Sequence, residues 1–255
     1  MSRAERRRLL ARAAAAGGAL LLGGCDRLSQ GAWWPRVLGS AEQLNRSLHH
    51  LLAPRRAMAE EFGEADVSPQ FRSNGTALPA SGEYRRLAAG GFADWALQVD
   101  GLVEAPARFT LAQLRALPAR TQITRHDCVE GWSAIGRWSG VPLAQVLERV
   151  RPTPAARYVV FHCADPMDAN PASTYYESID MEDALHPQTI LAYELNRAAL
   201  PVANGAPLRL RVERQLGYKM AKYLMRLELV GSFASIRGGG GGYWEDQGYE
   251  WYAGI

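Results

Sequence analysis

Residues 124–132 read TRHDCVEGW, and this stretch places one cysteine among an arginine, a histidine and two carboxylates. The thiolate is the form of cysteine that binds metal or attacks a substrate, and a nearby cation such as Arg125 favours that form. The stretch therefore makes Cys128 a candidate metal ligand or nucleophile. Arg125 and Glu130 could equally form a structural ion pair that braces the loop.

The length and charge of the chain predict one main globular domain. The chain has 255 residues, of which 47% are hydrophobic and 22% charged, as in ordinary globular proteins. Five arginines against one glutamate give residues 1–24 a charge of +4, so the overall +3 leaves about −1 for the remainder. A nucleic-acid partner is not expected, because such proteins carry a basic stripe.

Residues 1–24 have the pattern of an export signal. Their apolar run, residues 13–22, is too short to cross a bilayer. ERRRLL is a twin-arginine pattern, and residues 22–25 resemble a bacterial lipobox that would lipidate Cys25; an ordinary signal peptide with an incidental cysteine is the alternative. With Asp26 next in sequence, we expect twin-arginine export and lipid anchoring at the periplasmic face of the bacterial inner membrane.

The remaining cysteines, Cys128 and Cys163, would lie in an oxidising compartment. A disulfide between them is therefore one interpretation. A zinc site is less favoured, because the chain has no CxxC or HxxxH spacing.

The hydrophobic pattern favours an α+β fold, because helices and strands alternate without a regular βα period. We expect residues 25–65 to form a tether with an amphipathic helix at 37–52 that packs on its own protein, and residues 66–255 to form the main domain. Predicted strands cover residues 95–103, with a turn at Asp100-Gly101, 157–163 and 208–212. Predicted helices cover 109–117, with Thr110 as N-cap, and 141–150, started by Pro142.

Two stretches in the second half of the chain suggest binding functions. Residues 204–222, NGAPLRLRVERQLGYKMAK, contain five cations that could hold a phosphate or form a solvated strand face. These cations are Arg209, Arg211, Arg214, Lys219 and Lys222. Residues 237–255 contain five consecutive glycines and then five aromatic residues. This stretch could close over a pocket or form a mobile surface loop with its aromatics on the core.

Taken together, RHDCVEGW, NGAPLRL and YKMAK resemble the sulfite-oxidase fold superfamily of molybdenum enzymes, near the bacterial periplasmic methionine sulfoxide reductase catalytic subunits. The resemblance covers about residues 68–255 and implies a sulfite-oxidase-type molybdopterin-binding domain. It also implies one molybdenum-molybdopterin per chain, with Cys128 as the single protein ligand to the metal. A soft thiolate suits a metal that is already bound by sulfur.

The same resemblance implies the residues that contact the pterin and its phosphate. These residues are Asn74, Cys163, Asn204, Arg209, Met220, Ala221 and Lys222. Cys163 falls where the sulfoxide reductases have a threonine, so the resemblance replaces the disulfide by a free thiol that lines the pterin pocket.

Departures from the family bear on the substrate. Sulfite oxidases have an arginine four residues after the metal cysteine, where this chain has Trp132. Sulfite would then need another cation, Arg72 or Arg214. We expect Trp132 and Trp138 to form an aromatic wall for a neutral sulfoxide or similar oxide. Residues 213–215 and 242–255 also differ from the sulfoxide reductases, so the substrate need not be methionine sulfoxide.

The expected function is oxygen-atom transfer to or from a small oxide. Candidates for the rim of the site, besides Cys128, are Arg125, His126, Glu130, Trp132 and Trp138. The chain has no CxxCH motif, so we expect no haem and a separate electron-transfer partner, such as a membrane haem protein or a cytochrome. Without the dimerising immunoglobulin-like domain of eukaryotic sulfite oxidases, a monomer is expected. The alternatives are a sulfite dehydrogenase and a metal-free binding lipoprotein of the same fold.

Overall fold

The computed structural model describes residues 57–168, 170 and 173–255, together with positions 33, 40, 44, 47 and 48. The chain divides into two compact units, Met1–Leu52 and Ala53–Ile255. The predicted signal peptide and Cys25 lie outside the described residues. Within the predicted 37–52 helix, positions 40, 44, 47 and 48 are described, and all four are helical. Among the described residues, none of the helices combines the length and apolar character needed to span a bilayer.

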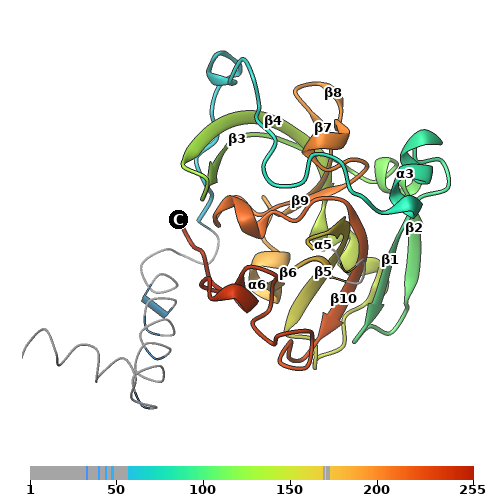
Figure 1. The fold of residues 1–255 in the computed structure, drawn as a ribbon, viewed down its shortest axis with the longest axis vertical. Coiled ribbons are helices and arrows are strands. Elements are labelled where there is room, and N and C mark those ends of the chain that lie inside the picture. Colours follow the sequence, from blue (N-terminus) through green and yellow to red (C-terminus); the bar gives the residue numbers. More distant parts are fainter. Residues whose placement is uncertain are drawn as a thin grey trace, which may run out of the picture. The chain divides into compact units, whose positions relative to one another are not determined.

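Two sheets form the body of the second unit (Figure 1). The first has the strand order β2-β1-β10-β5-β6, and the second has the order β3-β4-β7-β8, with β9 also pairing with β7. Strands β1 and β10 are parallel, and the other pairs are antiparallel. The first sheet comprises β1 (Ala96–Gly101), β2 (Ala107–Thr110), β5 (Tyr158–Pro166), β6 (Thr174–Asp180) and β10 (Leu224–Val230). The second comprises β3 (Arg120–Cys128), β4 (Trp132–Pro142), β7 (Ile190–Leu195), β8 (Ala198–Ala199) and β9 (Arg209–Arg211).

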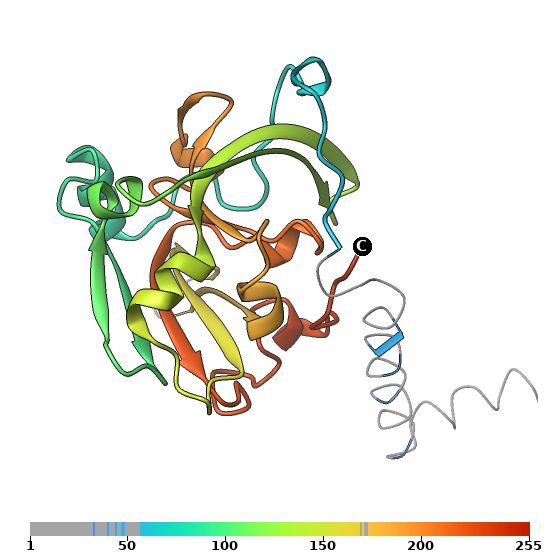
Figure 2. The ribbon, with the colours of Figure 1, turned by 180° about the vertical axis from the view of Figure 1, so that it is seen from behind.

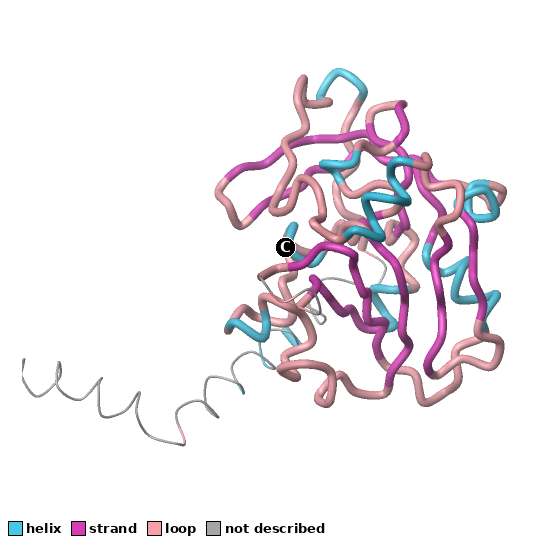
Figure 3. Tube along the Cα trace, turned by 45° about the vertical axis from the view of Figure 1, so that its right-hand side comes forward, coloured by secondary structure: helices cyan, strands magenta, loops and turns pink. Residues whose placement is uncertain are grey.

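The described helices are short, and α4, α5 and α6 each follow directly on a strand (Figure 3). The α-helices are α3 (Gly82–Ala89), α4 (Leu111–Arg115), α5 (Leu143–Val150) and α6 (Met181–Ala184). The 3-10 turns are η1 (Glu64–Asp66), η2 (Val202–Asn204), η3 (Gly217–Lys219) and η4 (Glu245–Gln247). This mixture of separate sheets and few helices is the predicted α+β class.

One hydrophobic core joins the two sheets. Leu97 and Val99 of β1 alternate with more exposed residues and enter this core, as a half-buried strand requires. Helix α5 adds four buried apolar side chains to the same core. Residues from β7 and β9 complete it from the second sheet. The ribbon of the same fold is seen from behind in Figure 2. Each fully buried aliphatic side chain stabilises the fold by roughly 1.5–3 kcal/mol.

Most elements predicted from the sequence are confirmed, with shifted boundaries. Thr110 caps α4, since its side chain accepts a hydrogen bond from the Gln113 N–H. Pro142 precedes α5 as its N-cap instead of being its first helical residue. Gly101 has a φ of +86°, which suits the predicted turn at the end of β1. Strand β5 continues past the predicted end at residue 163 to Pro166.

Part of the predicted 25–65 tether packs on the main body. The Ala59 N–H donates to the Gln188 side chain at 2.7 Å, and the Phe62 N–H donates to the Ile123 carbonyl at 2.8 Å. These contacts belong to the second unit, which begins at Ala53. The boundary between residues 65 and 66 remains a prediction.

Candidate functional site

Cys128 ends β3 at the tip of the long β3–β4 hairpin. It pairs with Trp132 across the hairpin, and its carbonyl accepts a hydrogen bond from the Gly131 N–H at 3.0 Å. Gly131 has a φ of +84°, a conformation that glycine adopts without the steric cost of a side chain. The tight turn therefore ends the strand and presents the thiol at its end.

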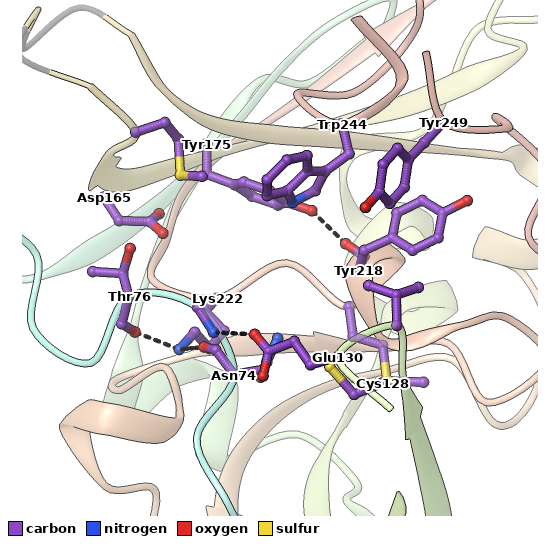
Figure 4. A pocket seen from close by; sticks show the side chains of 14 residues that line it. Asn74, Thr76, Cys128, Glu130, Asp165, Tyr175, Tyr218, Lys222, Trp244 and Tyr249 are labelled. Atoms are coloured by element: carbon purple, nitrogen blue, oxygen red, sulfur yellow. Dashed lines mark hydrogen bonds between the residues drawn. The ribbon is translucent and has the colours of Figure 1, made fainter. Parts of the chain in front are cut away.

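The thiol faces a pocket of about 280 Å³. Asn74, Cys128, Glu130 and Lys222 line one side (Figure 4). Tyr175, Tyr218, Trp244 and Tyr249 form the opposite side, and Thr76 and Asp165 lie toward one end (Figure 4). Segments far apart in the sequence thus converge on one cavity.

Lys222 fixes one side of this pocket. Its ammonium group donates to the carbonyls of Asn74 at 2.6 Å, Thr76 at 2.5 Å and Ala203 at 3.0 Å. Burial, with a contribution from Arg209, lowers the pKa of Lys222 to about 7. Lys222 therefore holds the 74–76 loop against the body and places a titratable cation beside the cavity.

Arg209 is a fully buried cation without a carboxylate at ion-pair distance among the residues that the structure describes. Its guanidinium donates to the carbonyls of Asn204 at 3.0 Å and Met220 at 3.2 Å. Burial, followed by repulsion from Arg211, lowers the pKa of Arg209 to about 9. A buried charge in this state is stabilised by a counter-ion, so the arrangement suits an anionic ligand.

Three buried polar atoms in this region have no hydrogen-bond partner. They are the Asn74 Oδ1, the Asn204 Nδ2 and the Arg209 Nε. Each such orphan costs roughly 1–3 kcal/mol of desolvation, and a polar ligand would remove that cost. The resemblance assigns all three residues to the cofactor. Asn74 lines the pocket, whereas Asn204 and Arg209 are not among its lining residues, so the Asn74 side of the pocket is the part that fits a polar, anionic cofactor.

The five cations of residues 204–222 do not act as one group. Arg211 lies 2.5 Å from Glu213, and Lys219 lies 2.5 Å from Glu177 and 2.6 Å from Glu245. The interpretation as a solvated strand face is wrong, because all five side chains are buried. Arg209 and Lys222 are the members of the set left for an external anion at the pocket side.

Cys128 lies in a less activating environment than its neighbours in sequence suggest. Burial raises the pKa of the Cys128 thiol and the Glu130 charge adds to this, whereas a hydrogen bond from the backbone at Glu130 and the charges of Arg209 and Arg72 oppose it. Arg125 points outward and pairs with Asp127 at 3.0 Å. The predictions that Arg125 favours the thiolate and that it pairs with Glu130 are therefore wrong. The reason is strand alternation, which puts residues 125 and 128 on opposite faces of β3.

Glu130 belongs to the pocket rim. Its carboxylate accepts hydrogen bonds from the Gly75 N–H at 3.2 Å and the Trp132 indole N–H at 3.0 Å. The bond from Trp132 lowers the pKa of Glu130. The ionised carboxylate therefore joins the 74–76 loop to the hairpin tip.

His126, Trp132 and Trp138 lie around the hairpin and do not line the pocket. The His126 Nδ1 lies 3.0 Å from the Arg211 guanidinium, and burial lowers the pKa of His126 well below its usual value. Trp138 is fully buried, with Arg209 and Arg211 over its ring at 5.0 and 4.5 Å. The predicted wall of Trp132 and Trp138 is therefore replaced by other aromatic residues.

Cys163 and Ala221 also lie off the pocket surface. Cys128 and Cys163 are both free, so the disulfide interpretation is wrong. Cys163 is a free thiol as predicted, but the prediction that it lines the pocket is wrong. The Cys163 Sγ lies in the core, 4.0 Å from the Phe161 carbonyl. Ala221 is buried, and its carbonyl accepts from the Leu210 N–H at 2.8 Å. Met220 is the neighbour that reaches the pocket.

Sequence reasoning did not assign the aromatic side of the pocket. Tyr218 sits inside the cation-rich stretch, and Trp244 and Tyr249 follow the glycine run. The one available signal was that glycines beside aromatics can close a cavity. Asp165 was also missed, and burial raises its pKa to about 7.

Comparison with known proteins identifies the family. A family model described as an oxidoreductase molybdopterin binding domain matches residues 87–234, more than half of the chain. A putative protein-methionine-sulfoxide reductase subunit of Azospira oryzae is 39% identical over 92% of this chain and 82% of that protein. A protein-methionine-sulfoxide reductase catalytic subunit of Ralstonia nicotianae is 38% identical over 53% of this chain and 44% of its own length.

A solved structure agrees with these sequence matches. The sulfane dehydrogenase SoxCD from Paracoccus pantotrophus superimposes with a TM-score of 0.51 at 26% identity, over 57% of this chain and 40% of that chain. Asn74, Trp244 and Tyr249 lie outside the residues that match the family model. The chain belongs to the oxidoreductase molybdopterin-binding domain family, and it is a molybdopterin-dependent oxidoreductase with an α+β, sulfite-oxidase-type fold.

Proposed function

We propose that the protein catalyses oxygen-atom transfer on a sulfoxide or a similar small oxide, with one molybdenum-molybdopterin bound per chain. The observation that carries this proposal is the arrangement of the pocket. One side offers a thiol, a cation and the unpartnered Asn74 Oδ1, and the opposite side is aromatic. Such a cavity suits a polar cofactor on one side and a neutral substrate on the other.

The residues on the polar side fit the cofactor. Cys128 would bind the metal, and Arg209 and Lys222 would neutralise the phosphate. Asn74 and Asn204 would offer their unpartnered amide atoms to the pterin. When bound, the cofactor supplies a metal that accepts an oxygen atom and cycles by two electrons.

The lining of the pocket favours a neutral oxide. Lys222 is the one cation among the described lining residues, and its hydrogen bonds go to main-chain carbonyls. Reduction of a sulfoxide consumes two electrons and two protons and releases a sulfide and water. Asp165 can hold a proton inside the pocket, because burial raises its pKa to about 7. Electrons would come from a separate partner, a membrane haem protein or a cytochrome.

The cellular setting completes the proposal. Twin-arginine export would carry a folded, cofactor-loaded enzyme, and lipidation of Cys25 would hold it at the periplasmic face of the inner membrane as a monomer. The signal pattern of residues 1–25 supports this location. Radiolabelled palmitate should enter the wild-type protein and should not enter Cys25→Ala.

Molybdenum content is the first test. Protein from a cofactor-competent host should contain about one molybdenum per chain and reduce sulfoxides with a reduced dye as donor, since the metal has one protein ligand in the proposed site. Cys128→Ser should lose both properties. Cys163→Ala is the matched control and should keep them, because Cys163 lies off the pocket. Well-folded wild-type protein without molybdenum would contradict the proposal and favour a metal-free binding protein.

Oxidation of sulfite is the second candidate, and one observation favours it. The Arg72 guanidinium lies 5.5 Å from the centre of the Trp132 ring, and its charge partly opposes the rise that burial causes in the pKa of Cys128. An anion at the pocket mouth could meet this cation. Sulfite oxidation that depends on Arg72, without sulfoxide reduction, would replace the first proposal by this one. Arg214 is buried and does not line the pocket.

A further inference from the structure

Residues 235–255 form a fixed wall of the pocket. This segment lies beyond the residues that match the family model. Trp244 and Tyr249 face the pocket across from Cys128 and Lys222 (Figure 4). The rings of Trp244 and Tyr249 lie 5.3 Å apart, and the Tyr249 N–H donates to the Trp244 carbonyl at 3.0 Å. The two rings are therefore held together by the turn around η4.

Buried charges anchor this wall to the body. Lys219 is fully buried between Glu177 of β6, at 2.5 Å, and Glu245 of η4, at 2.6 Å. Asp246 accepts from the Tyr176 hydroxyl and from two main-chain N–H groups of the glycine run. The segment directly after the glycines is thus fixed by the two carboxylates that follow Trp244, Glu245 and Asp246.

The glycine run lets the main chain of residues 238–242 lie close to these carboxylates. A Cβ at Gly240 would lie 2.9 Å from the Asp246 N, and one at Gly242 would collide with the Glu245 carboxylate. Real Cβ atoms do not approach so closely, so the loop wraps too tightly for side chains. The glycines therefore position the wall. Tyr243 and Trp244 pack against the core, as one interpretation predicted, and Trp244 and Tyr249 also line the pocket, as the other predicted.

The exposed edge of the wall is apolar. Tyr249 is 42% exposed and Val129, on the hairpin tip, is 47% exposed, and both line the pocket. The Tyr218 and Tyr249 rings meet edge to face at 5.4 Å, and both line the cavity. Aromatic surfaces bind other aromatic groups by offset or edge-to-face stacking. The shape and chemistry of the wall suit a flat apolar substituent.

We propose that Trp244 and Tyr249 are specificity-determining residues that receive the apolar substituent of the substrate, so that the enzyme prefers an aryl sulfoxide to a small dialkyl sulfoxide. This inference rests on the proposed sulfoxide chemistry. The polar side of the pocket holds the cofactor, and the aromatic side contacts the part of the substrate that does not react. Selectivity then comes from a segment outside the matched family domain.

The test compares methyl phenyl sulfoxide with dimethyl sulfoxide on molybdenum-loaded protein. Loss of one stacking partner with its buried area lowers the aryl-to-alkyl ratio of kcat/KM by about tenfold in Trp244→Ala or Tyr249→Ala. Trp244→Phe keeps a ring and should retain most of the preference. Binding of methyl phenyl sulfone and dimethyl sulfone, which the reaction does not consume, gives a calorimetric readout that is independent of turnover. Molybdenum content is measured for every variant.

The outcomes separate this inference from the proposed function. An unchanged ratio in Trp244→Ala and Tyr249→Ala, or an equal fall for both substrates at full molybdenum content, overturns the inference. Loss of molybdenum with unaltered sulfone selectivity also overturns it, because the wall would then cover the cofactor. Wild-type protein that reduces neither sulfoxide contradicts the proposed function, and sulfone binding still decides whether the wall selects aryl groups.

Discussion

Removing the Lys219 ammonium should leave a buried carboxylate without a charge partner. Lys219 contacts Glu177 and Glu245, and all three side chains are buried. Burial raises the pKa of Glu177 well above its usual range, with Glu245 adding to the rise and Lys219 opposing it. Burial alone would lower the pKa of Lys219, but the two carboxylates together raise it. The raised pKa of Glu177 leads us to predict that this side chain keeps its proton, so that the three-group cluster is neutral overall.

Lys219→Met leaves the second carboxyl either charged and unpaired or protonated. Breaking a buried ion pair by removing one partner costs about 3–5 kcal/mol. Protonation instead costs about 1.4 kcal/mol for each pH unit above an unfolded pKa of about 4.3, or about 1 kcal/mol at pH 5 and about 5 kcal/mol at pH 8. The loss of unfolding free energy in Lys219→Met is the smaller of these two costs at each pH. Since the carboxyl pKa is raised in the folded variant, stability is retained at low pH and lost as pH rises.

Urea unfolding followed by tryptophan fluorescence at pH 5, 6.5 and 8 measures this loss. The variant should be nearly as stable as wild type at pH 5, which also shows that it folds. Lys219→Met/Glu245→Gln is the matched control, because a neutral amide needs no proton, and it should recover about 3 kcal/mol of the loss at pH 8. A loss in Lys219→Met that is the same at all three pH values, or a double variant no more stable than the single one, would refute the neutral three-group cluster.

Three further predictions concern single positions. Burial raises the pKa of Asp183 to about 6, so the contribution of this side chain to stability falls as pH rises from 4 to 6. At pH 8 the free energy of unfolding of Asp183→Asn, measured in urea, should exceed that of the wild type by up to about 3 kcal/mol. Equal stability at pH 4 and pH 8 in both proteins would argue against this prediction. Gly140→Ala should destabilise the protein by more than about 2 kcal/mol, because its Cβ would collide with the β7 main chain. Gly82→Ala is the control, with open space around it, and should change stability by less than about 1 kcal/mol. Similar melting temperatures for the two variants would contradict the pairing of β4 with β7. Lys222→Met leaves the Asn74 carbonyl without its donor, whereas the Thr76 carbonyl keeps the Tyr223 hydroxyl and the Ala203 carbonyl keeps the Ser73 hydroxyl. The variant should therefore lose molybdenum and about 1–3 kcal/mol of stability for this one buried acceptor; full molybdenum content would show that the ammonium does not hold the cofactor.

Local patterns predicted the scaffold because they depend on neighbouring residues. Alternation marked β1, the capping threonine marked α4, and the proline marked the start of α5. The motif around Cys128 indicated the reactive position without any knowledge of the pocket. Asn74, Met220 and Lys222 were assigned by resemblance, and the structure brings all three to the cavity that Cys128 faces.

The direction of a side chain was harder to predict than its importance. Arg125 and Cys128 belong to one motif, yet the alternation of β3 sends the arginine to the surface, where it pairs with Asp127. Trp138 carries the same aromatic chemistry as Trp244, but it lies in the core beneath two arginines. Sequence distance to the cysteine therefore misled, because the pocket wall comes from more than 110 residues further along the chain.

Charge pairing explains why the cation-rich stretch could not be interpreted from its composition. A run of arginines and lysines can bind an anion only with the members that the protein has not already neutralised. Arg211 and Lys219 are neutralised by Glu213, Glu177 and Glu245, and two of these three carboxylates lie outside the stretch. The other three cations are Arg209, Arg214 and Lys222. Arg214 does not line the pocket, whereas Lys222 lines it and its pKa is lowered in part by the charge of Arg209. The anion site is thus defined as much by where the glutamates lie as by where the cations lie, and that information exists only in the folded chain.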